Sequence, residues 1–232
     1  MASGTADGVT VTVVKGEHGV SAHRIAAGLR ESILAGEMGP SERIRQEMVA
    51  AQYGASRVPV REALRILEAE GLVTLVANTG AWVSQLSLAE CEELYQIRER
   101  IEPLLLRFSI PNLSGEKITE LRRLADAMET GTNVEAFLRL DRDFHWLSYS
   151  AAETNVLGET TQRLWNATQH YRRAFTRLFT VEADRAVHYE HHLIVHAVER
   201  RDADEAERVL FGHIRRTRLE LARHPELFEH TD

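Results

Sequence analysis

The chain has little cysteine and no long apolar run. Cys91 is the single cysteine among its 232 residues, so no disulfide can form within the chain, and a lone thiol fits a reducing compartment. We interpret Cys91 as a small helix residue, because no neighbouring residue could serve as its base. No apolar run approaches the roughly 18 residues that a membrane-spanning helix needs. Residues 1–20 lack the order of a secretory signal, so we expect a flexible tail there and a cytoplasmic protein without a membrane partner.

Basic residues are outnumbered overall but locally concentrated. Lys and Arg number 28 against 35 Asp and Glu, and the resulting net charge of -7 argues against a nucleic-acid partner. Residues 43–65 reverse this balance, because their five basic residues outnumber their two acidic ones. The five basic residues are Arg43, Arg45, Arg57, Arg61 and Arg65. The chain is acidic, but this patch has the charge that a phosphate backbone attracts.

The order of elements in the first third of the chain predicts a winged helix-turn-helix domain over residues 21–84. An apolar stripe at steps of four indicates a first helix over 21–35, with Ser21 as its N-cap. A short second helix over about 45–52 leads into a tight turn at Gly54. A third helix lies between Ser56 and Gly71. Residues 72–86 then read as a two-stranded ribbon that bends at Gly80.

The rest of the chain is predicted to be helical. After a linker over 85–88, residues 89–223 show helical periodicity and no strand alternation, and residues 224–232 are expected to form a tail. Further helices are predicted over about 114–130, 133–151, 156–180, 182–200 and 202–223. The predicted fold class is therefore mainly α, with the winged domain followed by an antiparallel all-α bundle.

Three arginines of the third helix share one face, because Arg57, Arg61 and Arg65 are spaced four apart. In a helix-turn-helix, the N-terminal half of the second helix enters the major groove, where arginine can bind guanine edges or grip phosphates. The alternative is a solvated helix face whose charge is balanced by Glu62 and Glu68. The preceding turn and the following ribbon favour the DNA-binding interpretation.

Residues 21–83 resemble the DNA-binding domain of GntR-family bacterial transcription regulators, on the long motif "SRVPVREALRILEAEGLV". The resemblance implies that the start of this helix faces DNA and that the tip at Gly80 touches the minor groove. Many relatives carry an arginine before that glycine, where this chain has Thr79, so we expect a smaller contribution from the wing. The DNA-binding candidates are Arg45, Ser56, Arg57, Val58, Pro59, Arg61, Arg65, Thr79 and Gly80.

Polar side chains on three apolar helix faces suggest a metal site. Asp141 and His145 are i,i+4 neighbours on an inward face, and His191 and His213 lie on the apolar stripes of two later helices. Burying a carboxylate and three imidazoles is costly unless something satisfies them, and a divalent cation such as Zn, Ni or Mn would do so. The alternative is that each histidine makes a separate core hydrogen bond, since spacing cannot show that the helices meet.

Residues 89–223 resemble the C-terminal domain of the FadR subfamily of GntR regulators. The similarity rests on Asp141 to His145, on "EHHLI" at 190–194 and on "HI" at 213–214. It implies that Asp141, His145, His191 and His213 hold a divalent cation and that a small carboxylate effector binds there. Arg98 falls at the inward arginine position of the subfamily. The effector-binding candidates are Arg98, Asn155, Arg172 and Arg177.

These features predict a homodimeric transcription regulator, most simply a repressor, that binds a double-stranded DNA operator and is not an enzyme. A small organic acid at the metal would change the separation of the two recognition helices. Two alternatives stay open. One is an architectural DNA-binding dimer without an effector, and the other is a metal-dependent hydrolase in which Asp143 helps to activate water.

Overall fold

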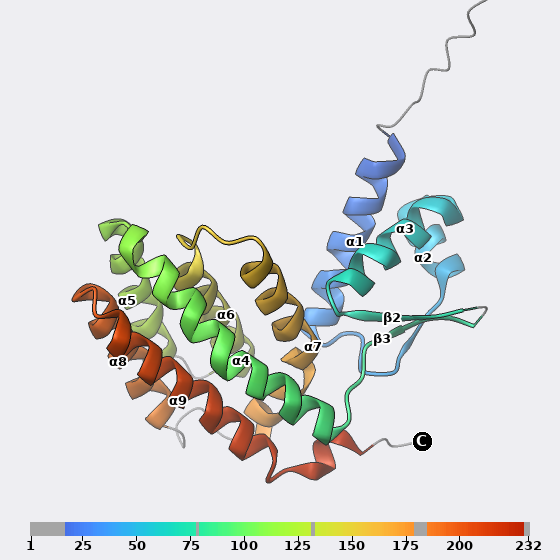
Figure 1. Cartoon of the computed structure of the whole chain (residues 1–232). Helices are drawn as coiled ribbons and strands as arrows, with labels where there is room; N and C mark the ends of the chain where they lie inside the picture. Colours follow the sequence, from blue (N-terminus) through green and yellow to red (C-terminus); the bar gives the residue numbers. More distant parts are fainter. Residues whose placement is uncertain (1–16, 78, 131–132, 179–184, 230–232) are drawn as a thin grey trace, which may run out of the picture.

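The computed structural model describes residues 17–77, 79–130, 133–178 and 185–229. Within them, an N-terminal head of three helices and a small sheet precedes a bundle of six α-helices, and α7 lies between the two (Figure 1). This confirms the predicted fold class. None of the helices among these residues is long and apolar enough to cross a membrane. The predicted tail over 1–20 falls mostly on residues 1–16, outside the described part.

The head packs its three helices against a three-stranded antiparallel sheet. Its elements are α1 (Glu17–Ala35), β1 (Arg43–Ile44), α2 (Gln46–Tyr53), α3 (Arg57–Ala69), β2 (Val73–Val76) and β3 (Gly80–Val83). The strand order is β1-β3-β2, with Thr74 opposite Trp82 and Ile44 opposite Ala81. On α3, the buried residues Val60, Leu64 and Leu67 recur at helical spacing and form the core side, which leaves the opposite side to solvent.

Two details of the head differ from the prediction. Helix α1 begins at Glu17, so Ser21 lies inside the helix rather than at its cap, and residues 17–20 are not part of a tail. The ribbon has a third strand, because Arg43–Ile44 pairs with β3. A strand of two residues is too short to show the alternation by which strands are recognised in a sequence.

The bundle consists of α4 (Leu88–Ser109), α5 (Gly115–Thr130), α6 (Val134–Tyr149), α7 (Val156–Leu178), α8 (Arg185–Glu199) and α9 (Ala203–Leu221), with 3₁₀ turns at Ile110–Asn112 and Pro225–Phe228. Ser87 and Glu90 form a capping box at the start of α4, as their spacing predicts. Helices α4 and α9 run antiparallel. Arg107 reaches Glu207 at 2.7 Å near the end of α4, and Arg218, near the end of α9, reaches Glu99 at 2.5 Å in the middle of α4.

The end of the chain packs onto the bundle further than expected. Phe228 is 9% exposed, and its ring stacks on Tyr171 of α7 with 4.4 Å between ring centroids. The predicted tail over 224–232 is therefore wrong for residues 225–228. An apolar pair, Leu227 and Phe228, follows Pro225 and provides surface for burial. Residues 230–232 lie outside the described part.

Candidate nucleic-acid interface and metal centre

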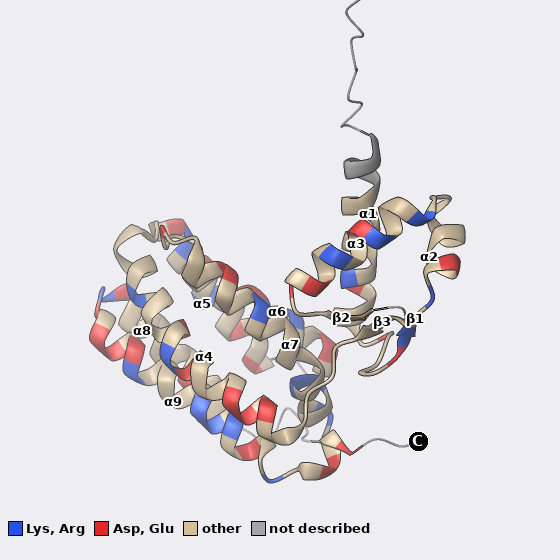
Figure 2. Ribbon diagram, turned by 45° about the vertical axis from the view of Figure 1, so that its right-hand side comes forward, with Lys and Arg blue, Asp and Glu red and all other residues tan. Residues whose placement is uncertain are grey.

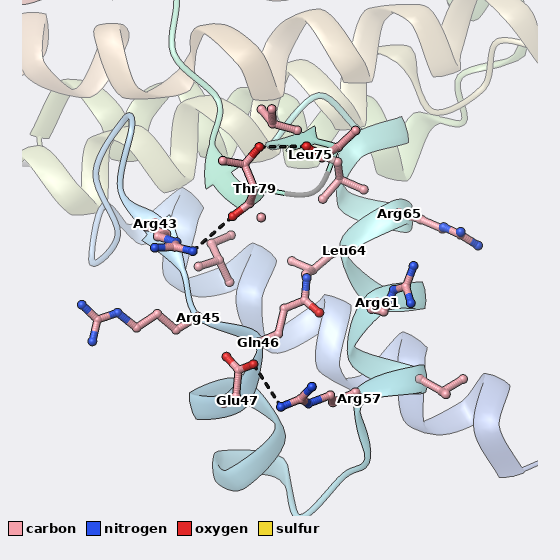
Figure 3. Close-up of a pocket in the computed structure, with 15 residues that line it drawn as sticks. Arg43, Arg45, Gln46, Glu47, Arg57, Arg61, Leu64, Arg65, Leu75 and Thr79 are labelled. Atoms are coloured by element: carbon pink, nitrogen blue, oxygen red, sulfur yellow. Dashed lines mark hydrogen bonds and ion pairs between the residues drawn. The ribbon is translucent and has the colours of Figure 1, made fainter.

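An open groove lined with arginines runs across the head between α3 and the sheet. Arg43 and Arg45 approach from one side and the arginines of α3 from the other (Figure 3). Figure 2 shows basic residues along α3, on a chain that is acidic overall. The lining arginines are Arg43, Arg45, Arg57, Arg61 and Arg65. The structure therefore brings together the basic patch that the sequence placed on two separate segments.

The groove arginines are held only weakly by the protein. Arg57 lies 3.4 Å from Glu47, and Arg65 lies 3.6 Å from Glu62, with both pairs mostly exposed. Exposed ion pairs contribute about 0–1 kcal/mol, so these guanidiniums can exchange a carboxylate for a phosphate or a base at little cost. Val58 is 64% exposed beside them, which suits apolar contact with a thymine methyl group. Ser56 and Thr79 are also exposed.

Pro59 does not face the groove, contrary to the prediction. It is buried with Val60 on the core side of α3. The helical period explains this, since residues 59, 60 and 63 share the inward face while 57, 58, 61 and 65 lie outside. Pro59 instead occupies the first turn of α3, where a missing amide proton costs nothing.

Arg43 is a groove residue that the sequence reasoning missed. Its Nη2 donates to the Thr79 carbonyl at 3.1 Å, and its guanidinium lies 5.7 Å from the centroid of the Trp82 ring. A guanidinium therefore stands at the wing tip, although Thr79 itself is uncharged. The only signal in the sequence was the basic count of residues 43–65, because the strand that carries Arg43 to the wing is too short to predict.

Helices α6, α8 and α9 bring Asp141, His145, His191 and His213 into one buried cluster. One ligand atom from each lies within 4.8 Å of the others. The Nε2 of His191 is 3.3 Å from Oδ1 of Asp141, and the Nε2 of His145 is 3.8 Å from the same atom. Ligand atoms that surround one cation at about 2.1 Å stand roughly 3–4 Å apart, so small side-chain shifts would complete a coordination shell.

The same cluster contains buried polar atoms without partners. Oδ1 of Asp141 and both ring nitrogens of His191 make no hydrogen bond in the described structure. Such atoms cost free energy in a low-dielectric interior unless a partner satisfies them. A cation at the centre of the cluster would satisfy the Asp141 oxygen and one His191 nitrogen together, so the residues present fit a divalent metal.

Outer partners hold two of the imidazoles in a ligating orientation. Nδ1 of His213 shares a hydrogen bond of 2.8 Å with Glu190, and Nδ1 of His145 shares one of 3.2 Å with the Tyr149 hydroxyl. Tyr149 in turn donates to Glu102 at 2.9 Å. These bonds leave Nε2 of both rings directed toward the cluster, the arrangement found around histidine ligands of metals. Glu190 and Tyr149 were not predicted, although Tyr149 lies four residues after His145.

The protonation states of Asp141, His145 and His191 suit a metal. Burial lowers the pKa of His191 to about 4 and holds the pKa of His145 well below its ordinary value of 6.5. Burial opposes ionisation of Asp141, but Arg172 and His145 together hold the pKa of its carboxyl well below 3.8. A carboxylate and neutral imidazoles are the forms that bind cations.

Two of the four predicted effector residues lie beside the cluster. Arg98 and Arg172 line a cavity of about 10 Å³, and their guanidiniums lie 4.7 and 5.3 Å from the centroid of the Trp165 ring. Arg172 forms a buried ion pair with Asp141. Arg98 bonds Glu102 at 2.6 Å and Thr168 at 2.9 Å, and this pair is buried rather than on the surface.

The other two candidates do not line this cavity. Asn155 is exposed in the loop before α7, where its carbonyl accepts from Glu159. Arg177 is mostly exposed and pairs with Glu135 at 2.8 Å. It follows Arg172 by five residues, which turns it about 140° away from the site around the helix.

Neither Asp143, which the enzyme alternative needs, nor the thiol of Cys91 is placed for catalysis. Asp143 is exposed, away from the buried ligands. Cys91 is buried, and burial raises the pKa of its thiol to about 12, which agrees with a small core residue rather than a nucleophile.

Comparisons with known proteins agree with this architecture. The family description "Bacterial regulatory proteins, gntR family" matches residues 21–83, and "FCD domain" matches residues 93–216. The transcriptional regulator YdhC of Bacillus subtilis is 27% identical over 80% of this chain and 84% of its own length. The Nta operon transcriptional regulator of Aminobacter aminovorans is 28% identical over 76% and 83%. The structure of Escherichia coli McbR superposes with a TM-score of 0.77 at 19% identity, covering 88% of this chain and 98% of that one, and shows a shared fold.

Proposed function

Because the chain belongs to the gntR family of bacterial regulatory proteins and carries an FCD domain, we propose that it is a transcriptional repressor whose operator affinity depends on a small organic acid bound at a divalent cation. DNA-binding regulation, rather than catalysis, is what its relatives do. The repressor sign, the effector and the metal are our proposal. A location in the bacterial cytoplasm, where the operator lies, is part of it.

The observation that carries the proposal is the buried cluster of Asp141, His145, His191 and His213 beneath a head with an arginine-lined groove. Four protein ligands leave positions open on a six-coordinate Zn, Ni or Mn ion, and the bound cation would supply positive charge and open positions for a carboxylate. Arg172 and Arg98 lie beside the cluster, and either guanidinium can bind a carboxylate through two parallel hydrogen bonds. The alternative of an architectural DNA-binding dimer does not account for this set of buried ligands.

A second copy of the chain completes the proposal, since GntR regulators act as dimers. Five exposed large apolar residues gather on the adjacent helices α4 and α9: Ile97, Leu104, Phe108, Phe211 and Leu219. The three on α4 follow at steps of seven and four, which is the spacing of a helix face that packs against another helix. Joining two copies on this face would present two heads to half-sites about one DNA turn apart.

Metal analysis and thermal unfolding test the site. We expect bound metal in protein purified without chelator, and an increase in the melting temperature of metal-free protein on addition of Zn2+, Ni2+ or Mn2+. Asp141→Ala should lose both responses. His192→Ala is the matched control, because His192 neighbours His191 in sequence but pairs with Glu129 on the surface at 3.0 Å. Absence of metal and of any thermal shift in the wild type would refute the metal site.

Selection of bound sequences from random duplexes, followed by titration of a carboxylate library with and without chelator, tests the effector. If one acid weakens DNA binding and chelator abolishes this effect, the result supports the repressor. If no acid changes DNA binding, the result favours the architectural alternative. For the dimer, Leu104→Glu should produce monomers by light scattering. Leu193→Glu on α8, also exposed and apolar, should not.

A further inference from the structure

Helix α7 touches the candidate metal site and the head through residues within a single stretch, 163–173. It lies between the bundle and the head in Figure 1. We propose that α7 transmits occupancy of the metal and acid site to the DNA-binding head, with Arg172 as the input contact and Arg173 and Asn166 as the output contacts. The inference rests on the proposed function and adds the route by which the site regulates the head.

One face of α7 is built into the site. Trp165 donates from Nε1 to Glu102 at 2.8 Å, Thr168 accepts from Arg98 at 2.9 Å, and Arg172 pairs with the ligand Asp141. These three residues are spaced three and four apart, so they lie on one side of the helix. All three are buried, and any change in the site that moves Arg172 acts on this face.

The neighbouring face of α7 holds the head at two helix ends. Arg173 donates from Nη2 to the Leu34 carbonyl, at the end of α1. Asn166 donates from Nδ2 to the Glu70 carbonyl at 3.1 Å, at the C-cap of the recognition helix α3. Carbonyls at helix C-termini lack intrahelical partners and carry partial negative charge, so they favour these donors.

Helix α7 and the head are closely packed against each other. A Cβ on Gly71, just after α3, would lie 3.0 Å from the backbone oxygen of Arg163, so the two backbones are in direct contact. A Cβ on Gly36, just after α1, would lie 2.9 Å from Cδ of Arg173. Arg173 itself is buried and also pairs with Glu135 of α6. A shift or rotation of α7 must therefore move the ends of α1 and α3.

Arg172 is suited to sense the site because it shares Asp141 with any bound cation. Arg172 pairs with Oδ2, whereas Oδ1 faces His191 and has no hydrogen-bond partner. Positive charge near Oδ1 would repel the guanidinium, and an added carboxylate would attract it. The cavity has room for about one water molecule, so an acid can enter only if lining side chains such as Arg172 move. Arg173 is the next residue, so this movement reaches the head contact through one peptide bond.

Hydrogen–deuterium exchange on the full-length, metal-free protein tests the proposal, with Zn2+ alone and Zn2+ plus citrate as probes. In the wild type we expect exchange to change at α6 and α7 and also at residues 33–37 and 69–72 of the head. In the double variant Asn166→Ala with Arg173→Gln, the bundle response should persist and the head response should disappear. Coupling between sites typically amounts to about 5- to 150-fold in affinity, so the lost response should be several-fold in exchange rate.

Arg177→Gln is the matched control, because it removes an ion pair to Glu135 from the same helix without touching the head. It should retain the head response. If the double variant does not fold, the single variant Asn166→Ala is measured in its place. It removes one hydrogen bond to the head and should weaken the head response. A head response that survives in the double variant refutes the route through α7. Zn2+ binding with no head response in the wild type refutes the inference but not the metal site, whereas no Zn2+ binding refutes both.

Discussion

The head and the bundle treat their charged groups in opposite ways. In the groove, arginines stand in water with loosely held partners, as in the Arg57–Glu47 pair, which is more than half exposed on both sides. In the bundle, Asp141 and His191 are wholly buried, and some of their polar atoms lack partners. An exposed arginine without bound DNA costs the folded state little free energy, because water solvates it. A buried unsatisfied carboxylate oxygen destabilises the folded state until a partner binds it. Single substitutions in the groove should therefore change the stability of the fold little, whereas substitutions in the cluster around Asp141 should change it strongly.

The largest expected effect is a loss of stability of the metal-free protein at acidic pH, caused by a histidine buried in the bundle. The pKa of His191 is about 4 in the folded chain and about 6.5 when unfolded, so between these values only the unfolded chain is protonated there. The contribution of His191 to the free energy of unfolding is therefore fully present above about pH 6.5. It decreases as the pH falls toward 4, by about 3 kcal/mol from His191 alone. Urea unfolding of metal-free protein across this range measures it. His191→Asn should flatten the dependence, and an unchanged slope would contradict the buried neutral imidazole.

On the head, Arg61→Ala should weaken operator binding by about 1–3 kcal/mol, because Arg61 lies exposed on the groove face of α3. Electrophoretic mobility shift on the selected operator measures this, and circular dichroism should be unchanged. Arg61→Lys separates the two modes of contact. A lysine retains a phosphate contact but not a bidentate bond to guanine. Equal affinity of wild type and Arg61→Ala would remove Arg61 from the interface.

A smaller effect is expected for Glu190, which lies beside the candidate metal ligands. Glu190→Gln keeps the shape of the partner of His213 but removes its charge, and Zn2+ affinity should decrease by about 10–100-fold. Competition with a fluorescent chelator gives the value. Glu129→Gln, beside the surface histidine His192, is the control and should leave Zn2+ affinity unaltered. If both variants bind alike, the hydrogen bond to Glu190 does not tune the site.

The smallest effect is expected at the wing. Arg43→Ala should reduce operator affinity by less than Arg61→Ala and lower the slope of log affinity against log salt by about 1, because one phosphate contact is lost. Binding measured at several salt concentrations tests this. Arg43→Lys should restore the slope. A slope that is equal in wild type and Arg43→Ala would show that Arg43 only supports the wing through Thr79.

Local patterns were enough for most of the fold. Helical spacing placed Arg57, Arg61 and Arg65 on one face and Asp141 with His145 on another, and the Ser87–Glu90 box marked the start of α4. Such features depend on residues within a few positions of each other, which a sequence displays directly. The same reasoning could not place side chains whose surroundings come from elsewhere in the chain: Pro59 is buried, and Asn155 and Arg177 are exposed away from the cavity.

The sequence by itself determined the class of the protein, the faces of its helices and the residues able to bind a cation. Only the tertiary structure decided that α6, α8 and α9 converge so that His191 approaches Asp141, that β1 carries Arg43 to the wing, and that α7 connects the site to the head. The physical reason is the separation along the chain of the residues that each feature involves. Helix periodicity follows from neighbouring residues, whereas the candidate ligand cluster joins side chains up to 72 positions apart, from Asp141 to His213, and their meeting depends on how whole helices pack.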